Sequence, residues 1–154
     1  MRVVVLVLVL VLTAVSMTAC GAEGDDDAAA SSPTTPAKTP SPYRGLPDGA
    51  TPTDASPAGV HVGDDLLIHV ITYGSSGNPA LVRKVAAEGQ TVTVTVKPVE
   101  GRISTMDYVP TTSTFVLPPG VDTRKPVTFV LGSFGAVTVD AVTPGAQAWV
   151  DVED

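Results

Sequence analysis

Two patterns of hydrophobic and polar residues divide the chain, and the first is an apolar run near its start. Ten apolar residues follow one another without a break from Val3 to Leu12, after a single basic residue, Arg2. A short basic start, an apolar core and small residues before a cleavage point are the parts of a secretory signal peptide. The run is shorter than the roughly 20 apolar residues that a membrane-spanning helix needs. The pattern therefore predicts a signal peptide over residues 1–19 and an exported chain.

The second pattern begins near Val60, where short β-branched runs alternate with Gly, Pro, Asp and Ser. In residues 91–99, Val92, Val94 and Val96 alternate with threonines. This period of two predicts a strand with one face on a core and the other in water. Similar runs bring the expected number to about seven strands, over residues 64–73, 80–87, 91–99, 112–117, 126–131, 136–142 and 147–152.

The strand spacing predicts the fold class. No stretch of ten or more residues has a convincing helical period, so we expect an all-β domain over residues 60–154. Short strands with frequent turn signals are typical of a small antiparallel two-sheet sandwich of the immunoglobulin-like class, and a small barrel is the competing architecture. We expect Pro98 and Pro110 to end the ladders that they follow, because proline has no N–H to donate.

Between the signal and the domain lies a polar, proline-rich segment. Residues 21–59 hold seven of the fourteen prolines and the acidic run Asp25–Asp27. Almost nothing in this segment could be buried, so nothing offsets the entropy of ordering it. We therefore expect residues 20–59 to be a disordered tether that begins with a cysteine.

Charge and cysteine content exclude several classes of partner and fold. The formal net charge is −7, which gives no electrostatic footprint for nucleic acid or for anionic lipid headgroups. The single cysteine rules out an intrachain disulfide, so the domain must depend on its hydrophobic core. The sequence does not indicate an oligomeric state.

The residues around this cysteine carry a resemblance. Met17-Thr18-Ala19-Cys20 resembles the lipobox of bacterial lipoproteins. The resemblance implies cleavage between Ala19 and Cys20, acylation of Cys20 with a diacylglycerol such as one carrying palmitate, and anchoring in the lipid bilayer at the outer face of the cell membrane. The alternative is an ordinary signal peptide cut nearby, with Cys20 left as a free thiol.

The domain itself carries a fainter resemblance. Residues 71–76, 106–112 and 117–122 are similar to segments of small, uncharacterised exported β-sandwich proteins of Gram-positive bacteria. This resemblance implies a fold and no activity. It also implies a cysteine pair near the first loop and near Thr105, and this chain has neither cysteine.

Few residues could bind a metal or perform catalysis. His61 with Asp64 and Asp65 could form a weak divalent site, but we interpret this stretch as a solvated strand start. His69 lies within a strand and is expected to be packed or at an edge. There is no G-x-S-x-G motif for a nucleophile, and the sequence does not exclude a Ser–His–Asp set assembled in space. We expect no metal, no cofactor and no enzymatic activity.

The best candidate for recognition is the one tryptophan. If Ala148 and Val150 face the core, Trp149 points outward, and with Tyr108 or Phe134 it could form a contact surface for an envelope protein or glycan. The alternative is that Trp149 packs inward. Two functional hypotheses remain: a non-catalytic binding or structural module at the envelope, or a small envelope metal carrier or hydrolase whose site the sequence does not show.

Overall fold

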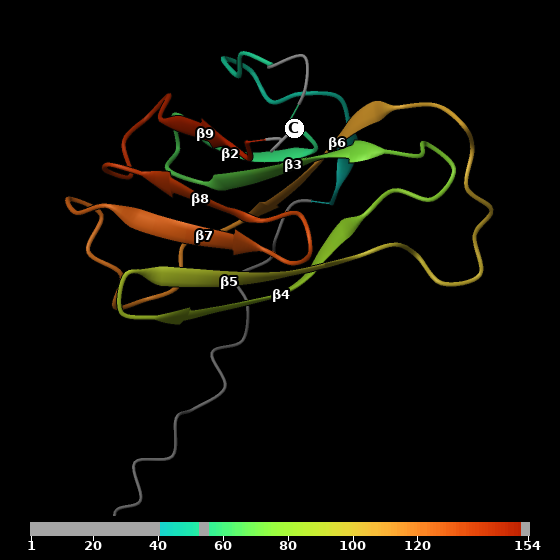
Figure 1. Ribbon diagram of the computed structural model, residues 1–154. Helices are drawn as coiled ribbons and strands as arrows, with labels where there is room; N and C mark the ends of the chain where they lie inside the picture. The colour runs from blue at the N-terminus through green and yellow to red at the C-terminus, as the bar shows by residue number, and fades with distance from the viewer. Residues whose placement is uncertain (1–40, 53–55, 152–154) are drawn as a thin grey trace, which may run out of the picture. The chain divides into compact units, whose positions relative to one another are not determined.

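The computed structural model describes residues 41–52 and 56–151, all within one compact unit, Thr35–Asp154. In these residues the regular structure is entirely β (Figure 1). The nine strands are β1 (Tyr43–Arg44), β2 (Ala58–Val62), β3 (Ile68–Gly74), β4 (Leu81–Glu88), β5 (Thr91–Lys97), β6 (Val109–Phe115), β7 (Val127–Leu131), β8 (Ala136–Val139) and β9 (Gln147–Trp149).

The strands form two sheets that face each other. The five-stranded sheet has the order β1-β6-β3-β2-β9, and the four-stranded sheet has the order β4-β5-β7-β8 (Figure 1). Every strand pairing is antiparallel except that of β5 with β7, which is parallel. The predicted small β-sandwich is therefore confirmed, with nine strands in the described residues instead of about seven.

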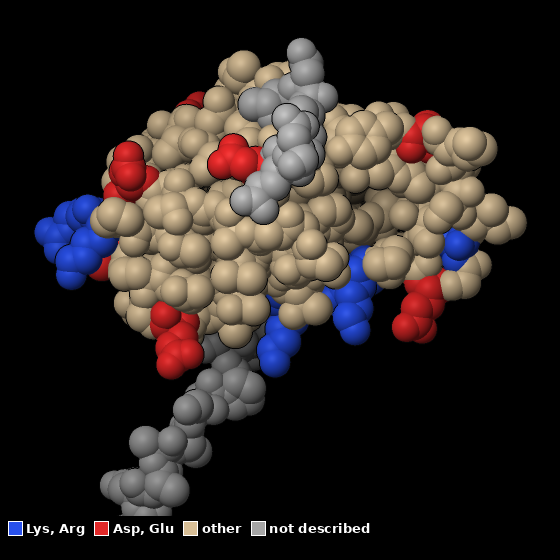
Figure 2. All heavy atoms as spheres, viewed as in Figure 1, with Lys and Arg blue, Asp and Glu red and all other residues tan. Residues whose placement is uncertain are grey.

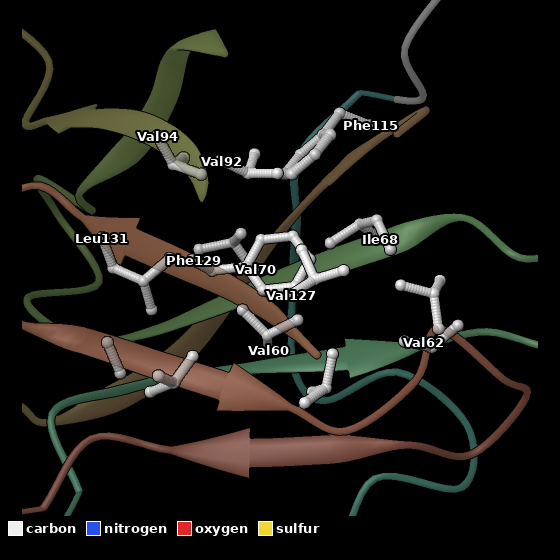
Figure 3. Packing of buried hydrophobic residues seen from close by; sticks show 14 of the residues in the cluster. Val60, Val62, Ile68, Val70, Val92, Val94, Phe115, Val127, Phe129 and Leu131 are labelled. Atoms are coloured by element: carbon white, nitrogen blue, oxygen red, sulfur yellow. The ribbon is translucent and has the colours of Figure 1, made fainter. Parts of the chain in front are cut away.

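The core lies between the two sheets and is made mostly of valine. Figure 3 shows side chains from both layers meeting there, with Val60, Ile68 and Val70 from one sheet and Val94 and Phe129 from the other. All five are completely buried. Because β-branched side chains stand well on a pleated surface, a valine-rich core suits this fold.

Strand β5 has the predicted alternation. Val92 and Val94 are buried and Val96 packs against the core, whereas Thr91 and Thr93 are exposed. Strand β4, beside it, is the outer strand of its sheet and has a bulge between Val82 and Lys84 on the β4 side of the pair. Bulges of this kind protect sheet edges from pairing with other chains.

Residues 45–52 form a strap across the outer face of the five-stranded sheet. The strap begins at edge strand β1, where the Gly45 N–H donates to Pro110 O (2.9 Å), and it reaches the opposite edge, where the Thr51 N–H donates to Gln147 Oε1 (3.0 Å). In Figure 1 the strap is the blue-green segment above the sheet that contains β2 and β3. The outward-facing side chains of Ile71 and Thr112 are therefore completely buried.

The strap corrects the predicted start of the domain. We expected the tether to continue to Gly59, but β1, the strap and the first residues of β2 belong to the sandwich. The sequence pattern does not reveal β1, because this strand has only two paired residues and lies between Pro42 and Pro47. The rest of the predicted tether, and the predicted signal peptide, lie outside the described residues.

Two further expectations were wrong in detail. Pro110 lies inside β6, opposite Tyr73, so it does not end the ladder. Strand β3 begins at Ile68 rather than near Asp64, because residues 63–67 form a turn in which the Gly63 N–H donates to Leu67 O (2.9 Å). Leu66 has a positive φ of 62° in this turn.

Candidate functional site

The predicted lipid-attachment residues lie outside the part of the chain that the structure describes. Ala19 and Cys20 are both among the residues whose placement is not described. The lipobox and the cleavage point therefore stay predictions. Within residues 41–52 and 56–151, no helix has the length and hydrophobicity needed to cross a membrane.

Trp149 lies on the outer face of the five-stranded sheet, as the alternation of its strand predicted. Ala148 packs against the core, Val150 is buried within it, and Gln147 is exposed. Trp149 lies directly opposite Gly59 in the β2–β9 pair, and a Cβ at Gly59 would lie 2.7 Å from Trp149 Cδ2. The indole therefore lies against the backbone of β2, where only glycine leaves room for it.

This close packing removes much of the indole from the surface. Trp149 is only partly exposed, and its Nε1 is buried without a hydrogen-bond partner in the described structure. Its ring centre is 6.4 Å from that of Tyr73, at an interplanar angle of 50°. Trp149 is thus outward-facing but half-buried, and it contributes to the packing of the sheet.

The aromatic row continues from Trp149 through Tyr73 to Tyr108. The Tyr73 and Tyr108 rings stack, with their centres 5.3 Å apart and their planes 22° from parallel. Tyr108 is 60% exposed, so it is the most accessible ring of the three. The structure therefore brings Trp149 and Tyr108 together through Tyr73, a residue that the sequence analysis did not select.

Phe134 is not part of this row. It lies in the turn between β7 and β8, where its N–H donates to Leu131 O (3.1 Å), and its side chain packs against the core. Its neighbour Gly135 approaches Val150, which is itself a core residue. Phe134 is therefore half-buried and lies apart from the aromatic row, and its part in a contact surface stays a prediction.

Beside Tyr108, two loops are joined by hydrogen bonds at one end of the sandwich. The first loop is residues 75–79, between β3 and β4. The second is residues 100–108, between β5 and β6, which we call the contact loop. The two loops lie next to each other in Figure 1. The Ser75 and Thr105 hydroxyls are 3.0 Å apart, and the Thr105 N–H donates to Ser75 Oγ (2.7 Å). These hydroxyls meet in the region where the fainter resemblance implies a cysteine pair.

Asp107 strengthens the link between the loops. It accepts hydrogen bonds from the Ser76 N–H (3.0 Å) and from the Thr105 hydroxyl. Hydrogen bonds from Ser76 and Thr105 hold the pKa of Asp107 well below its usual range, so the carboxylate stays ionised. A Cβ at Gly77 would lie 2.6 Å from Ile103 O, which shows how closely the two loops approach each other.

The contact loop exposes its large apolar side chains although its backbone is held in place. Ile103 is 87% exposed, Met106 is fully exposed and Tyr108 is 60% exposed. Only Tyr43, Leu66 and Val116 are other large apolar residues that are exposed in the described chain. The sequence contained a signal for this surface, since apolar residues at irregular spacing in residues 100–110 fit neither strand nor helix.

The two histidines lie side by side on the outer face of the five-stranded sheet. His61 and His69 are paired across β2 and β3, with ring centres 5.9 Å apart. His69 Nδ1 is 3.0 Å from the Thr114 hydroxyl. Both ring nitrogens of His61 are buried without a hydrogen-bond partner in the described structure, and a Cβ at Gly49 in the strap would lie 3.6 Å from His61 Nε2.

This burial corrects the interpretation of His61 as part of a solvated strand start. His61 is only 3% exposed. Burial, and then the charge of His69, lower the pKa of His61, while Asp64 opposes them. Burial likewise lowers the pKa of His69, and Asp65 opposes it. Both rings are therefore favoured in the neutral form.

The described residues do not complete a metal-binding group around the two histidines. Among them there is no group of three or more His, Cys, Asp or Glu residues that could hold a metal ion. The hydroxyl beside His69 belongs to Thr114, which is 3% exposed, so it is closed to a substrate. The arrangement with the greatest access to a partner is therefore the contact loop and its aromatic row.

Comparison with known proteins finds no family model, no curated protein and no solved structure that matches this chain.

Proposed function

We propose that this chain is an envelope lipoprotein whose β-sandwich is a non-catalytic binding module and whose contact surface is the contact loop. In this proposal, residues 1–19 direct export, and acylated Cys20 anchors the chain at the outer face of the cell membrane. The partner is a protein or a glycan of the envelope. The observation that carries the binding role is the exposure of Ile103, Met106 and Tyr108 on one hydrogen-bonded loop.

Two energetic features of the contact loop favour a binding role. A soluble domain usually buries large apolar side chains or scatters them singly over its surface. Here three lie on one loop, although the fold has a separate core that they do not enter. Because Ser75, Ser76 and Gly77 are hydrogen-bonded to this loop, it loses little backbone freedom when a partner binds. Exposed apolar groups on a preformed loop favour contact with a partner.

The binding role can be tested by capture on isolated cell-wall polymer and on purified envelope proteins of a Gram-positive bacterium. The variant I103S/M106S/Y108S removes the apolar contacts, and we expect it to weaken capture by at least about tenfold. Val116→Ser is the matched control, because Val116 is an exposed apolar residue outside the loop, 51% accessible. Equal capture by the loop variant and the control would refute the proposed contact surface.

The anchor needs a separate test. Replacing Cys20 with Ala removes the only thiol of the chain. We expect the protein to leave the detergent phase or to stay uncleaved, and we expect the wild-type N-terminal peptide to carry the mass of an acylated cysteine. A mature N-terminus at another residue, without lipid, would contradict the proposed anchor and leave the binding role untouched.

A further inference from the structure

Beside the contact loop, the surface contains a hollow of about 240 Å³. It lies where β1, residues 75–79 and the contact loop meet. We call it the arginine hollow because two arginines line it, and its lining includes Tyr43, Arg44, Ser76, Pro79, Leu81 and Arg102. A volume of this size accommodates a ligand of about one sugar ring and is below the usual range for drug-sized ligands.

Neither arginine has an acidic partner in the described structure. The ion pairs of residues 41–52 and 56–151 both involve Asp122, which accepts from Arg124 and Lys125 at a different loop. Arg44 donates to the backbone carbonyl of Ser76 (3.2 Å), which orients its side chain without neutralising it. The side chain of Arg102 is exposed and makes no hydrogen bond with a described residue.

The contact loop has two carboxylates, Glu100 and Asp107, and neither lines the hollow. Asp107 accepts hydrogen bonds from Ser76 and Thr105, which join the two loops. Two arginines therefore line the hollow without a carboxylate in its lining, and Asp107 is used for the structure of the loop. Figure 2 shows both basic and acidic side chains along the border of the molecule below β4 and β5, on a chain with a net charge of −7.

The rest of the lining determines which anion fits. A guanidinium group binds a carboxylate or a phosphate through two parallel hydrogen bonds. Tyr43, which is 40% exposed, lines the hollow together with Pro79 and Leu81, and these side chains offer apolar contact to a ring. Ser76 also lines the hollow, but its hydroxyl is 3.3 Å from the Thr105 hydroxyl and belongs to the link between the loops.

We propose that the arginine hollow binds an oxyanion, a carboxylate or a phosphate, that is carried on a sugar unit. This inference rests on the proposed binding function and specifies the chemistry of the partner: an anionic glycan. Arg102 is part of both surfaces, since it belongs to the contact loop and lines the hollow. One anionic glycan could therefore reach the hollow with its charged sugar and the apolar side chains with the next one.

The test is a titration of the chain from Gly21 to Asp154, which contains the whole compact unit Thr35–Asp154, followed by nuclear magnetic resonance. The probes are glucuronate, glucose 6-phosphate and glucose. We expect one or both acids to shift the Tyr43 ring and arginine Nε signals, and we expect glucose to bind at least about tenfold more weakly. Raising the salt concentration from 0.05 to 0.5 M should weaken the acids and leave glucose unchanged.

Arg44→Ala and Arg102→Ala should each weaken the binding of the acids by about tenfold or more. Arg83→Ala is the matched control, because Arg83 is exposed and donates to a backbone carbonyl, Pro98 O (3.4 Å), outside the hollow. Arg102 makes no described side-chain bond, so a loss in that variant cannot be attributed to misfolding. The acid that binds, carboxylate or phosphate, identifies the source of the charge.

Failure of this inference is distinguishable from failure of the proposed function. If no acid binds, or if Arg102→Ala binds like Arg83→Ala, the hollow is not an anion site. If the envelope is then still captured and the loop variant still loses capture, the binding module stands with another ligand. If the acids bind but the loop variant captures normally, the hollow stands and the contact loop does not.

Discussion

The contact between Trp149 and Gly59 allows a quantitative test of whether the tryptophan is structural. Trp149 lies against Gly59 across the β2–β9 pair and close to Tyr73. Truncating a fully buried tryptophan to alanine costs about 3–5 kcal/mol. Because this side chain is only partly buried, we expect Trp149→Ala to lower the free energy of unfolding by about 2–3 kcal/mol. For a domain of this size that corresponds to a fall of about 8–12 °C in the thermal midpoint.

A substitution of Gly59 tests the same contact from β2, the other strand of the pair. A Cβ at Gly59 would lie 2.7 Å from Trp149 Cδ2 and 2.9 Å from Ala148 O, so Gly59→Ala forces the indole or the strand to move. We expect a cost of about 1–3 kcal/mol. In the Trp149→Ala background the indole is gone and only the contact with the Ala148 carbonyl remains. The same change should then cost less, with a coupling energy of about 1–2 kcal/mol.

The assay is urea unfolding followed by far-ultraviolet circular dichroism, because removing Trp149 also removes the only tryptophan as a fluorescent probe. Gly74→Ala is the control, since a Cβ at Gly74 would meet nothing within 4 Å. Equal costs of Gly59→Ala in the two backgrounds would refute the reasoning. A midpoint that barely changes in Trp149→Ala would show that the indole is free to serve as a contact residue.

Three further predictions concern stability. Val94→Ala should cost about 1–3 kcal/mol because Val94 is completely buried, whereas Thr93→Lys on the exposed face should change the free energy of unfolding by less than about 0.5 kcal/mol; urea unfolding measures both. Leu66→Asn should raise the free energy of unfolding by about 0.5–1 kcal/mol, because asparagine adopts the positive φ of 62° more readily. An unchanged or lower midpoint of urea unfolding would contradict this. Burial lowers the pKa of His61 in the folded chain below the ordinary histidine value of 6.5, so the unfolded chain binds more protons in acid. The stability that neutral His61 contributes should therefore be fully present above about pH 6.5 and decrease as the pH drops below it. A series of thermal midpoints measures this decrease, which should be smaller in His61→Leu.

The sequence predicts well the parts of this fold in which one face of a strand meets water. In β5 the buried Val92 and Val94 alternate with the exposed Thr91 and Thr93, so the period of two is visible. In β2 all five residues are buried, because the opposite sheet covers one face and the strap covers much of the other. No alternation survives in such a strand, which is why Ala58 and Gly59 were assigned to the tether.

The candidate site was predictable only in part, for a related reason. Alternation along β9 gave the direction of Trp149, but its burial depends on the absence of a side chain at Gly59, which is 90 residues earlier in the sequence. The hollow likewise joins Arg44, Ser76 and Arg102 from three distant segments. Pairing between strands brings these residues together, and local sequence patterns carry no information about it.

The strap also determines how the domain would respond to mechanical load. Any pull transmitted along the chain from residues before Ser41 enters the sandwich through β1, which is joined to β6 by only two residue pairs. The next attachments are the bonds of Gly45 with Pro110 and Thr112 and the single bond from Thr51 to Gln147. Under tension this segment would detach first, with the two-sheet core still closed, and the released length would uncover the imidazole of His61. Under load, β1 and the strap would thus extend the chain before the two-sheet core unfolds.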